Sequence, residues 1–459
     1  MIMNLGEKDN PITELRKAEV KLKNGDTISL DIPKTVYPPR EDSALLIEYL
    51  ETLEPNGIAM EIGCGSGILS IILARNNWSV ESCDINPFAI AAAKKNSISA
   101  SVEEKINFRE SGVGEENFSI PVETKLLFWN LPYLNPPSPN EPRLGWIEEA
   151  SMSDMAEKGW GHQLADFLEE NNMYLEPDLL IILLQRKYPK SPSNAEYWLK
   201  KGWSHRVIKT IWIYGEKLEI VAYWRPGQGI PMRILEECIS TMDEAKKLPE
   251  IGWQRVQTNK QIEGRGRKES KWISDERDLL ATWNINKTIL SDLNPGIVQI
   301  IIGTKIADLL KQYCKWPNDI IDNNGQKIGG VLIEMDNQKE HLRIGVGLNY
   351  SSKEIEGMEI TGWNDKFPDI NKKDMSKMID AVLSTLFENH ELLENNLSVD
   401  KFNRDSWRGL SKLLSRGYSL DLDGEKTRVI GLNNEGGLTV LLKGEKSEIQ
   451  SIEKLNWLF

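Results

Sequence analysis

The stretch Arg225-Pro226-Gly227-Gln228-Gly229-Ile230-Pro231 constrains the fold of this chain more than any other. Its prolines lack a backbone N–H and its glycines favour irregular backbone, so neither a helix nor a central strand is expected to run through it. The chain has 459 residues, which is too many for one hydrophobic core. We therefore expect separately folded parts on either side of this linker, about three domains in all.

The composition is that of an ordinary globular protein, with 40% hydrophobic and 27% charged residues. A net charge of -13 disfavours non-specific binding of nucleic acid over the whole surface, although a local basic patch remains compatible with it. The four cysteines lack metal-ligand spacing, which predicts reduced, buried thiols and a cytoplasmic location. No apolar run reaches membrane-spanning length, and the first residues lack the profile of a signal peptide.

Before the linker, buried strands alternate with helices. Strands are predicted at 58–62, 79–83, 125–129 and 178–184, and an antiparallel pair at 205–213 and 217–224. This alternation predicts a Rossmann-like, doubly wound parallel sheet. Residues up to about 36 are expected to form a short extended lead-in.

Two features place a binding site at the ends of these strands. The turn Glu61-Ile62-Gly63-Cys64-Gly65-Ser66-Gly67 carries three glycines, which permit a tight turn and let a ligand touch the backbone. A dinucleotide site would use a similar turn. Asp84 ends the second strand about 20 residues later, where a carboxylate can accept both hydroxyls of a ribose.

The segment Asn130-Leu131-Pro132-Tyr133 follows the strand at 125–129. The Asn130 side-chain oxygen and the backbone carbonyl next to Pro132 can accept hydrogen bonds from an NH2 group and direct its lone pair at a methyl sulfonium. Tyr133 can stack on a planar amide or base.

These residues resemble the class I S-adenosylmethionine-dependent methyltransferases, and within them the HemK-like group that methylates the glutamine amide of translation release factors. The support is Val36–Ser43, the Asp84-Ile85-Asn86-Pro87 segment and the Asn-x-Pro-Tyr tetrapeptide, over roughly residues 30–226. The resemblance implies catalytic roles for Asn130, Pro132 and Tyr133, and S-adenosylmethionine binding by Glu61, Gly63, Gly65, Gly67, Asp84 and Asn130.

One departure leaves the substrate open. Leu131 stands where the family usually has proline, and related methyltransferases that act on adenine accept leucine there. Adenine in nucleic acid is therefore an alternative substrate, and a domain that binds a cofactor or partner without catalysis is the alternative function.

After the linker, a helix is predicted at 233–248, strands at 253–261, 279–284 and 342–348, and a long helix from Asn294 through Tyr313. A further helix is predicted at 375–393. From about Ser406 onward short strands and turns predict a small β-barrel.

Two motifs in this half are suited to anionic ligands. Pro317 cannot donate to a sheet ladder, so Lys315-Trp316-Pro317-Asn318-Asp319 ends a strand and holds the Lys315 ammonium beside a turn. The loop Gly264-Arg265-Gly266-Arg267-Lys268 places three cations between glycines, where they can close onto phosphates.

This half resembles the biotin protein ligases over roughly residues 232–459. The resemblance rests on the two motifs above, Ser240-Thr241, the Lys327 hairpin and Gly345-x-Gly347-x-Asn349. It implies a mixed sheet backed by helices, followed by an SH3-like barrel. The implied biotin and ATP contacts are Ser240, Thr241, Gln261, Gly264, Arg265, Gly266, Arg267, Lys268, Trp272, Lys315, Asn318, Asp319, Lys327, Gly329, Gly330, Gly345, Gly347 and Asn349.

The implied chemistry is ATP-dependent formation of biotinyl-5′-AMP and transfer of biotin to a lysine of a biotin carboxyl carrier protein or domain. Lys315, Arg265 and Arg267 are the implied catalytic cations, and Mg2+ is expected, with Asp319 as a weak, indirect ligand. Ser270 stands where many relatives have arginine, and Met242 where asparagine is common. The helix-turn-helix of repressor-type ligases is not found, so a DNA-repressor role is not expected.

The sequence thus predicts a bifunctional chain with a methyltransferase-like domain at 1–226, a ligase catalytic domain at 232–400 and an SH3-like barrel at 404–459.

Overall fold

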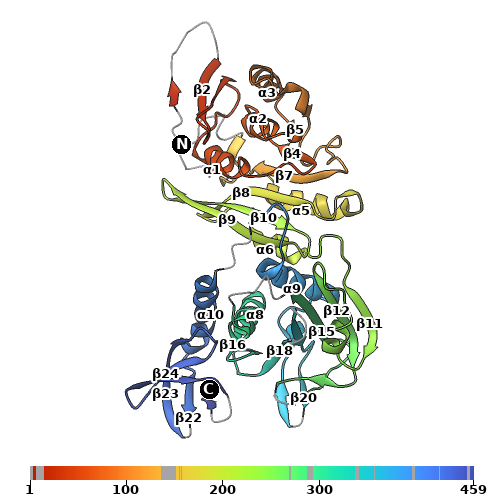
Figure 1. Cartoon of the computed structure of the whole chain (residues 1–459), viewed down its shortest axis with the longest axis vertical. Helices are drawn as coiled ribbons and strands as arrows, with labels where there is room; N and C mark the ends of the chain where they lie inside the picture. Colours follow the sequence, from red (N-terminus) through yellow and green to blue (C-terminus); the bar gives the residue numbers. More distant parts are fainter. Residues whose placement is uncertain are drawn as a thin grey trace. The chain divides into compact units, whose positions relative to one another are not determined.

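A computed structural model describes residues 4–6, 15–135, 151–154, 156, 158–267, 270–286, 293–335, 341–355, 357–394, 398–422, 424–451 and 455–458. The chain forms two compact units (Figure 1). Unit 1 contains Met1–Gln228 and His390–Leu392, and unit 2 contains Gly229–Asn389 and Leu393–Phe459. The division between Gln228 and Gly229 falls within the linker.

Unit 1 begins with an antiparallel sheet in the order β1-β2-β3 (Asn4–Gly6, Leu15–Lys21, Thr27–Pro33). The predicted lead-in thus contains a hairpin of β2 and β3, with Gly25 in the left-handed region at its turn (φ 91). Alternate residues of β3 are buried, as one packed face of a sheet requires. The Asn96 side chain fixes this hairpin, because its oxygen accepts from Asp31 N at 2.9 Å while its nitrogen donates to Ser66 O at 2.9 Å.

The main sheet of unit 1 has the order β6-β5-β4-β7-β8-β10-β9. β4 to β8 run parallel, and β10 and β9 complete one edge antiparallel. The strands are β4 (Ile58–Ile62), β5 (Ser79–Asp84), β6 (Ile106–Glu110), β7 (Thr124–Asn130), β8 (Leu180–Tyr188), β9 (Ser204–Ile213) and β10 (Glu216–Trp224). The chain leaves β4 toward β5 and returns on the other side at β7, so a crevice is expected between the carboxyl ends of β4 and β7.

The helices of unit 1 are α1 (Glu41–Leu50), α2 (Ile68–Arg75), α3 (Pro87–Ser99), α5 (Trp160–Glu170) and α6 (Ala195–Lys200). The central strands are apolar on both faces, because consecutive residues such as Leu126, Leu127 and Phe128 are fully buried. The predicted alternation of strands and helices is confirmed here.

Unit 2 is built on a mixed sheet in the order β11-β12-β15-β19-β18-β17-β16, with β21 added at β18 and β20 paired to β21. Its strands are β11 (Arg233–Cys238), β12 (Gln254–Gln261), β15 (Leu279–Asn286), β16 (Tyr313–Lys315), β17 (Asp319–Ile321), β18 (Lys327–Met335), β19 (His341–Leu348), β20 (Lys353–Ile355) and β21 (Met358–Ile360). The short hairpin β13–β14 (Gly264–Arg265, Lys271–Trp272) is separate.

The helices of this sheet are α7 (Thr241–Ala245), α8 (Pro295–Leu309) and α9 (Lys372–Phe387). α9 is fixed to the sheet by Asp380, which pairs with Arg255 Nε at 2.9 Å. The same carboxylate accepts from the indole nitrogens of Trp253 and Trp283, each at 2.8 Å. A buried ion pair of this kind holds its position because every charged atom finds a partner.

Three sequence predictions for this half are wrong. The helix predicted at 233–248 is strand β11 followed by the short α7. Parallel pairing of β11 with β12 overrides the helical pattern, and Ser240 caps a helix only after the strand has ended. The helix predicted through Tyr313 ends at Leu309, because Lys311 is left-handed (φ 52) and Tyr313 already pairs with β17.

The third wrong prediction concerns the residues after Ser406, which are helical as far as Leu414 in α10 (Val399–Leu414). Its buried residues Phe402, Leu410 and Leu413 form one apolar face. A side chain at Gly409 would lie 2.2 Å from Thr304 Cγ2, so glycine is needed for α10 to approach α8 closely.

The last part of the chain is a five-stranded antiparallel sheet in the order β25-β24-β23-β22-β26. Its strands are β22 (Ser419–Leu422), β23 (Glu425–Leu432), β24 (Leu438–Leu442), β25 (Glu445–Ile449) and β26 (Leu455–Leu458). The turn between β23 and β24 contacts the segment between β16 and β17, because the Trp316 indole donates to Gly436 O at 2.8 Å. At Gly296 a side chain would meet Glu435 O at 2.1 Å.

All four cysteines are buried and free, as predicted for reduced thiols. Among the helices of the described residues, none is long and apolar enough to cross a bilayer.

Two candidate active sites

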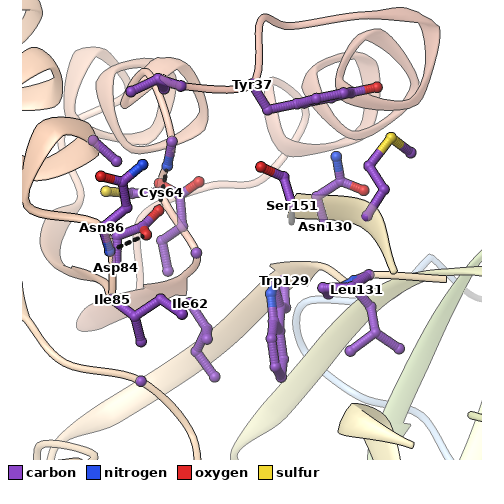
Figure 2. A pocket seen from close by; sticks show the side chains of 18 of the residues that line it. Tyr37, Ile62, Cys64, Asp84, Ile85, Asn86, Trp129, Asn130, Leu131 and Ser151 are labelled. Atoms are coloured by element: carbon purple, nitrogen blue, oxygen red, sulfur yellow. Dashed lines mark hydrogen bonds between the residues drawn. The ribbon is translucent and has the colours of Figure 1, made fainter. Parts of the chain in front are cut away.

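A cavity of about 680 Å³ opens in unit 1 where the topology predicts a crevice. It is lined by the ends of β4 and β7, the glycine-rich turn and the start of α1. Figure 2 shows Asp84 and Asn86 on one side of this cavity and Asn130 and Ser151 on the other, with the Tyr37 ring above. The sequence-predicted site residues Glu61, Gly63, Gly65, Asp84, Asn130, Pro132 and Tyr133 all line it.

The glycine-rich turn brings backbone to this cavity. Gly63, Gly65 and Gly67 have φ of 68, 52 and 82, values that other residues adopt only at a cost. Gly67 does not line the cavity. Its role is to let α2 begin against α3, since a side chain there would lie 2.8 Å from Ala93 Cβ.

Asp84 holds the turn and faces the cavity. Its carboxylate accepts from Gly65 N and from Asn86 N, each at 2.9 Å, as the dashed lines in Figure 2 show. Burial raises the pKa of Asp84, and the two backbone N–H groups lower it in part. Because Asp84 lines the cavity, its carboxylate can accept hydrogen bonds from the hydroxyl groups of a ribose.

Glu61 is buried beneath the turn. Its carboxyl group bonds both to Ser70 N, at 3.0 Å, and to the Ser70 hydroxyl. Burial raises its pKa to about 8, against an ordinary value of 4.5. The side chain thus connects β4 to α2 and carries a proton at neutral pH.

Asn130 presents one open polar atom. Its Nδ2 donates to Asp42 Oδ2 at 3.0 Å, whereas its Oδ1 is buried and has no hydrogen-bond partner in the described part of the chain. A buried acceptor without a partner is costly, and because Asn130 lines the cavity, this oxygen is available to a ligand that donates to it.

Tyr133 lies at the other end of the same tetrapeptide and is only 5% exposed. The Arg186 guanidinium lies 5.9 Å from its ring centroid, and Arg186 in turn pairs with Glu216 at 2.6 Å. Leu131, which replaces the family's proline, is fully buried in the core behind the tetrapeptide.

Sequence reasoning missed several residues of this cavity, namely Tyr37, Asp42, Ser111, Val113, Trp129, Ser151 and Trp160. No local feature of the sequence marks Asp42 as a residue of this cavity. It lies directly after an extended segment, at the first turn of α1 where a carboxylate would be exposed, yet it is 3% exposed.

The second cavity, of about 290 Å³, lies in unit 2. It brings together β12, the β13–β14 hairpin, β18 and β19. The predicted residues that line it are Ser240, Thr241, Gln261, Arg265, Gly266, Arg267, Trp272, Asn318, Asp319, Lys327, Gly330, Gly345 and Gly347. Lys268 lies outside the described residues.

One end of this cavity is neutral and polar. Gln261 Oε1 accepts from Thr241 N at 2.8 Å and from Thr241 Oγ1 at 3.0 Å. Thr282 donates to the same threonine hydroxyl at 2.8 Å. Ser240 is nearly buried and caps α7. These side chains can replace their internal hydrogen bonds with hydrogen bonds to a small polar group of a ligand.

The other end is cationic. Asp319 lies between two lysines, with Lys327 Nζ at 2.7 Å and Lys315 Nζ at 3.9 Å. Burial lowers the pKa of Arg267, and the nearby Asp319 charge raises it in part. Arg267 Nη1 is buried without a hydrogen-bond partner in the described part of the chain, which again indicates an acceptor brought by a ligand.

Arg265 is held away from this group by acids. Its guanidinium lies 3.0 Å from Asp243 Oδ1 and 3.5 Å from Glu334 Oε1. A ligand would have to compete with both carboxylates for Arg265.

Trp272 lines the cavity together with the residues of both ends. A side chain at Gly347 would lie 2.8 Å from its indole, so glycine there makes room for the ring. Lys327 Nζ lies 5.5 Å from the ring centroid, within range of a cation–π contact. The indole nitrogen of Trp272 is buried without a partner among the described residues.

Four predicted residues do not line this cavity, namely Gly264, Lys315, Gly329 and Asn349. A side chain at Gly264 would lie 2.4 Å from Trp272 O, and one at Gly329 would lie 2.4 Å from Gly347 O, so both glycines serve strand pairing. Asn349 is buried, with its Nδ2 3.4 Å from Lys327 O. Lys315 lies beside the lining, since its Nζ is 3.9 Å from Asp319 Oδ2 and Asp319 lines the cavity.

Met242 and Ser270, the two departures from the ligase pattern, both line this cavity. The Ser270 hydroxyl donates to Arg267 O at 2.7 Å and so fixes the loop backbone where relatives carry another cation. Among the described residues no group of three or more His, Cys, Asp or Glu could hold a metal ion.

Comparison with known families supports two separate domains. Residues 41–124 match the methyltransferase small domain, and residues 241–349 match the biotin/lipoate A/B protein ligase family.

Curated relatives divide in the same way. A Methanocaldococcus jannaschii protein provisionally named as a protein N5-glutamine methyltransferase is 28% identical over 200 residues, which are 43% of this chain and 96% of that protein. The bifunctional ligase/repressor BirA of Bacillus spizizenii is 30% identical over 123 residues, which are 25% of this chain and 34% of the relative. The chain therefore spans about a third of the length of this ligase relative.

Among solved structures, a biotin protein ligase from Aquifex aeolicus in complex with biotin and ATP is 22% identical. The match covers 50% of this chain and 98% of that structure, with a TM-score of 0.40.

Proposed function

We propose that this chain, which joins a methyltransferase domain to a biotin ligase domain, is a bifunctional enzyme. Unit 2 activates biotin with ATP and transfers it to a lysine of a carrier protein, and unit 1 transfers a methyl group from S-adenosylmethionine to a planar nitrogen. One observation carries each part. The cavity of unit 2 has a neutral hydrogen-bonding end and a cationic end, and that of unit 1 has an open acceptor at Asn130 facing the same space as Asp84.

In unit 2, Thr241 and Gln261 would bind the ureido head of biotin, which both donates and accepts hydrogen bonds. Its carboxylate would then lie toward Lys315 and Arg267. Two anions must meet when a carboxylate attacks the α-phosphate of ATP, so fixed positive charge should supply most of the rate enhancement. The carboxylate oxygen forms a bond to phosphorus, pyrophosphate leaves, and a carrier lysine later displaces AMP from the resulting biotinyl-5′-AMP.

The loop around Arg267 would close on this adenylate. Arg267 already has an unpaired, buried donor, and Arg265 would leave Asp243 and Glu334 to join it. Mg2+ would be held chiefly by the phosphates, because Asp319 is the acidic side chain at this end and it faces Lys315 and Lys327. Its predicted indirect role in metal binding remains a proposal.

In unit 1, Asp84 would accept the ribose hydroxyls, and the turn at Gly63 and Gly65 would let the cofactor approach the backbone. S-adenosylmethionine supplies a methyl group on a positively charged sulfur. Asn130 Oδ1 and the carbonyl next to Pro132 would accept the two N–H bonds of the substrate, and Tyr133 would stack on its plane. The nitrogen bonds to the methyl carbon as the carbon–sulfur bond breaks, and one N–H proton passes to solvent.

A protein glutamine amide is the proposed methyl acceptor, because the matched relative and the resemblance to the HemK-like group agree on this class. A translation release factor and a biotin carboxyl carrier protein are the proposed partners, and the cytoplasm, where both are found, is the proposed location. Adenine is the second acceptor to test, because related methyltransferases that act on adenine accept leucine at the position of Leu131.

We further propose that the domains are 1–226, 232–400 and 404–459, with α10 at the junction of the last two. The terminal sheet is proposed to be a small SH3-like barrel. β23 pairs with β22 through its first residues and with β24 through its last, across a register shift between Val429 and Gly431. β26, the last strand in the chain, pairs with β22, the first strand of this part.

Two assays on the full chain test these activities separately. Labelled biotin, ATP and a carrier domain should give biotinylated carrier, and its absence would refute the ligase activity. Labelled S-adenosylmethionine should methylate a glutamine-containing release-factor fragment in preference to an adenine oligonucleotide. Cofactor binding without transfer to either substrate would instead support a non-catalytic role for unit 1.

A further inference from the structure

We infer that Asp42 is a positioning residue that fixes the orientation of the Asn130 side chain, so that the cavity presents an acceptor to the substrate nitrogen. The inference rests on the proposed methyl transfer and extends it to a residue on α1, outside the tetrapeptide and outside the glycine-rich turn.

Asp42 is placed for this role, and the hydrogen bonds from Asn130 and Ser43 lower in part the pKa of its carboxyl, which burial raises. It is 3% exposed and lines the cavity beside Asn130. Its Oδ2 accepts from Asn130 Nδ2 at 3.0 Å, and its Oδ1 accepts from Ser43 N at 2.6 Å and lies 3.3 Å from the Ser43 hydroxyl. The carboxylate is thus held on both oxygens, so it is a fixed acceptor and not a mobile one.

The orientation of Asn130 follows from this fixed acceptor. An asparagine side chain has a donating and an accepting end of nearly the same shape, and either can face a given direction. A carboxylate only accepts, so facing it with Oδ1 would bring two electron-rich oxygens together. Nδ2 therefore faces Asp42, and Oδ1 faces the cavity, where it is buried without a partner in the described part of the chain.

This arrangement decides which nitrogens can be methylated. An outward-facing Oδ1 accepts from an N–H, so it selects a primary amide or an exocyclic amine over a group that offers only acceptors. The same contact ties the tetrapeptide Asn130-Leu131-Pro132-Tyr133 to α1. Asp42 anchors its first residue by a hydrogen bond, and Arg186 lies over its last, Tyr133, at 5.9 Å.

Two substitutions separate positioning from packing. Asp42→Asn and Asp42→Leu both keep the approximate shape of the side chain, but the first keeps one accepting atom and the second keeps none. If Asp42 acts through Asn130, methyl transfer should fall about 10-fold in the asparagine variant and about 100-fold in the leucine variant, as expected for a misplaced reacting group. The affinity for S-adenosylmethionine should change by less than about threefold, because Asp84 and the glycine turn are intact.

The matched control is Asp26→Asn, which removes another carboxylate of unit 1 from an exposed ion pair with Arg75. It should transfer methyl groups at the wild-type rate. Equal rates for the wild type and Asp42→Leu would overturn the inference.

A double-mutant cycle gives the sharper test. Asn130→Ala removes the side chain that Asp42 is proposed to orient, so adding Asp42→Leu to it should cost no further activity. A packing role for Asp42 would instead give an additional loss in this background, and that result would refute positioning.

A last measurement does not depend on activity. If the wild type methylates neither glutamine nor adenine, the proposed function fails, but the orientation of Asn130 can still be measured in the full chain labelled with 15N-asparagine. The Asn130 side-chain NH2 signal, assigned by its loss in Asn130→Asp, should exchange slowly with solvent in the wild type and at least tenfold faster in Asp42→Leu. Equal exchange in both would overturn the inference, whatever the substrate is.

Discussion

The two cavities of this chain carry opposite charge. In unit 1 the carboxyls of Asp42 and Asp84 line the cavity, whereas in unit 2 Lys327 and Arg267 line one end beside Asp319, with Lys315 3.9 Å from that acid. The proposed ligands differ in the same sense, because a sulfonium is a cation while ATP and a carboxylate are anions. Each site has the charge that its reacting group requires, although the chain as a whole is acidic.

The two sites also differ in how their charges are held. Asp84 and Asp42 accept backbone or amide N–H bonds that a ligand need not break. In contrast, Lys327 pairs with Asp319, and Arg265 pairs with Asp243 and Glu334. The cavity of unit 1 is therefore preorganised, whereas the cavity of unit 2 must exchange internal ion pairs for ligand contacts. The predictions below test this contrast.

The largest expected effect is at Lys315. Lys315→Ala should slow biotinyl-5′-AMP formation by roughly 100-fold or more, on the scale of losing one preorganised charge at a reacting centre. Pyrophosphate release measures this step, and methyl transfer by the same protein serves as the internal control. Near-wild-type pyrophosphate release would show that other cations carry the role.

Asp84→Asn tests the preorganised site. Because the amide of asparagine keeps one accepting oxygen, the loss should be on the order of one charge-assisted hydrogen bond, about 1.5–3 kcal/mol, so the Kd for S-adenosylmethionine should rise by about 10- to 150-fold. Titration calorimetry on the full chain measures it. A Kd that stays the same would mean that the ribose does not lie at Asp84, and biotin affinity should not change in either case.

Arg267→Gly tests closure of the loop in unit 2. Without this cation the adenylate should escape before transfer, and biotin on bystander lysines should rise about five- to tenfold, roughly 1–1.4 kcal/mol of lost retention. Biotinylation of a non-carrier protein in the reaction measures the leak. Unchanged selectivity would contradict the view that this site closes on its ligand.

The smallest effect concerns pH and unit 1. The pKa of Glu61 is about 8 in the folded protein and is near 4.5 when the group is exposed, so its contribution to stability is fully present below about pH 4.5 and is lost as pH rises through 8. Glu61→Gln should therefore have little effect at pH 5 but stabilise the ligand-free chain by on the order of 1 kcal/mol at pH 8.5. Calorimetric unfolding at both pH values measures it, and the same difference at both would contradict a buried, protonated Glu61.

Much of unit 1 was predictable because its signals are local. A buried strand, a glycine turn and a helix follow one another within about a dozen residues, and parallel strands bring Asp84 and Asn130 to one edge without further information. Asp42 was not predictable in this way. Its importance depends on a contact with Asn130, 88 residues away, which no local pattern records.

In unit 2 the site motifs were easier to predict than the secondary structure. Its motifs indicated the ligand, but three elements were predicted wrongly because long-range pairing decides them, as for β11 beside β12. The motif residues also divide in a way that sequence could not show. Gly330 faces the cavity, whereas its neighbour Gly329 serves the contact between strands, since only the backbone register separates their roles.

The hydrogen bond from Trp316 to Gly436 bears on how such a chain can be shortened or recombined. Among the described residues, the terminal sheet supplies none to the lining of the unit 2 cavity, so a gene ending near codon 400 would still encode every described side chain that lines it. The shortened product would nevertheless leave the Trp316 indole, 2% exposed, without its acceptor, directly beside Lys315. A cut at this later boundary would therefore impair a cavity that the described residues of the terminal sheet do not line.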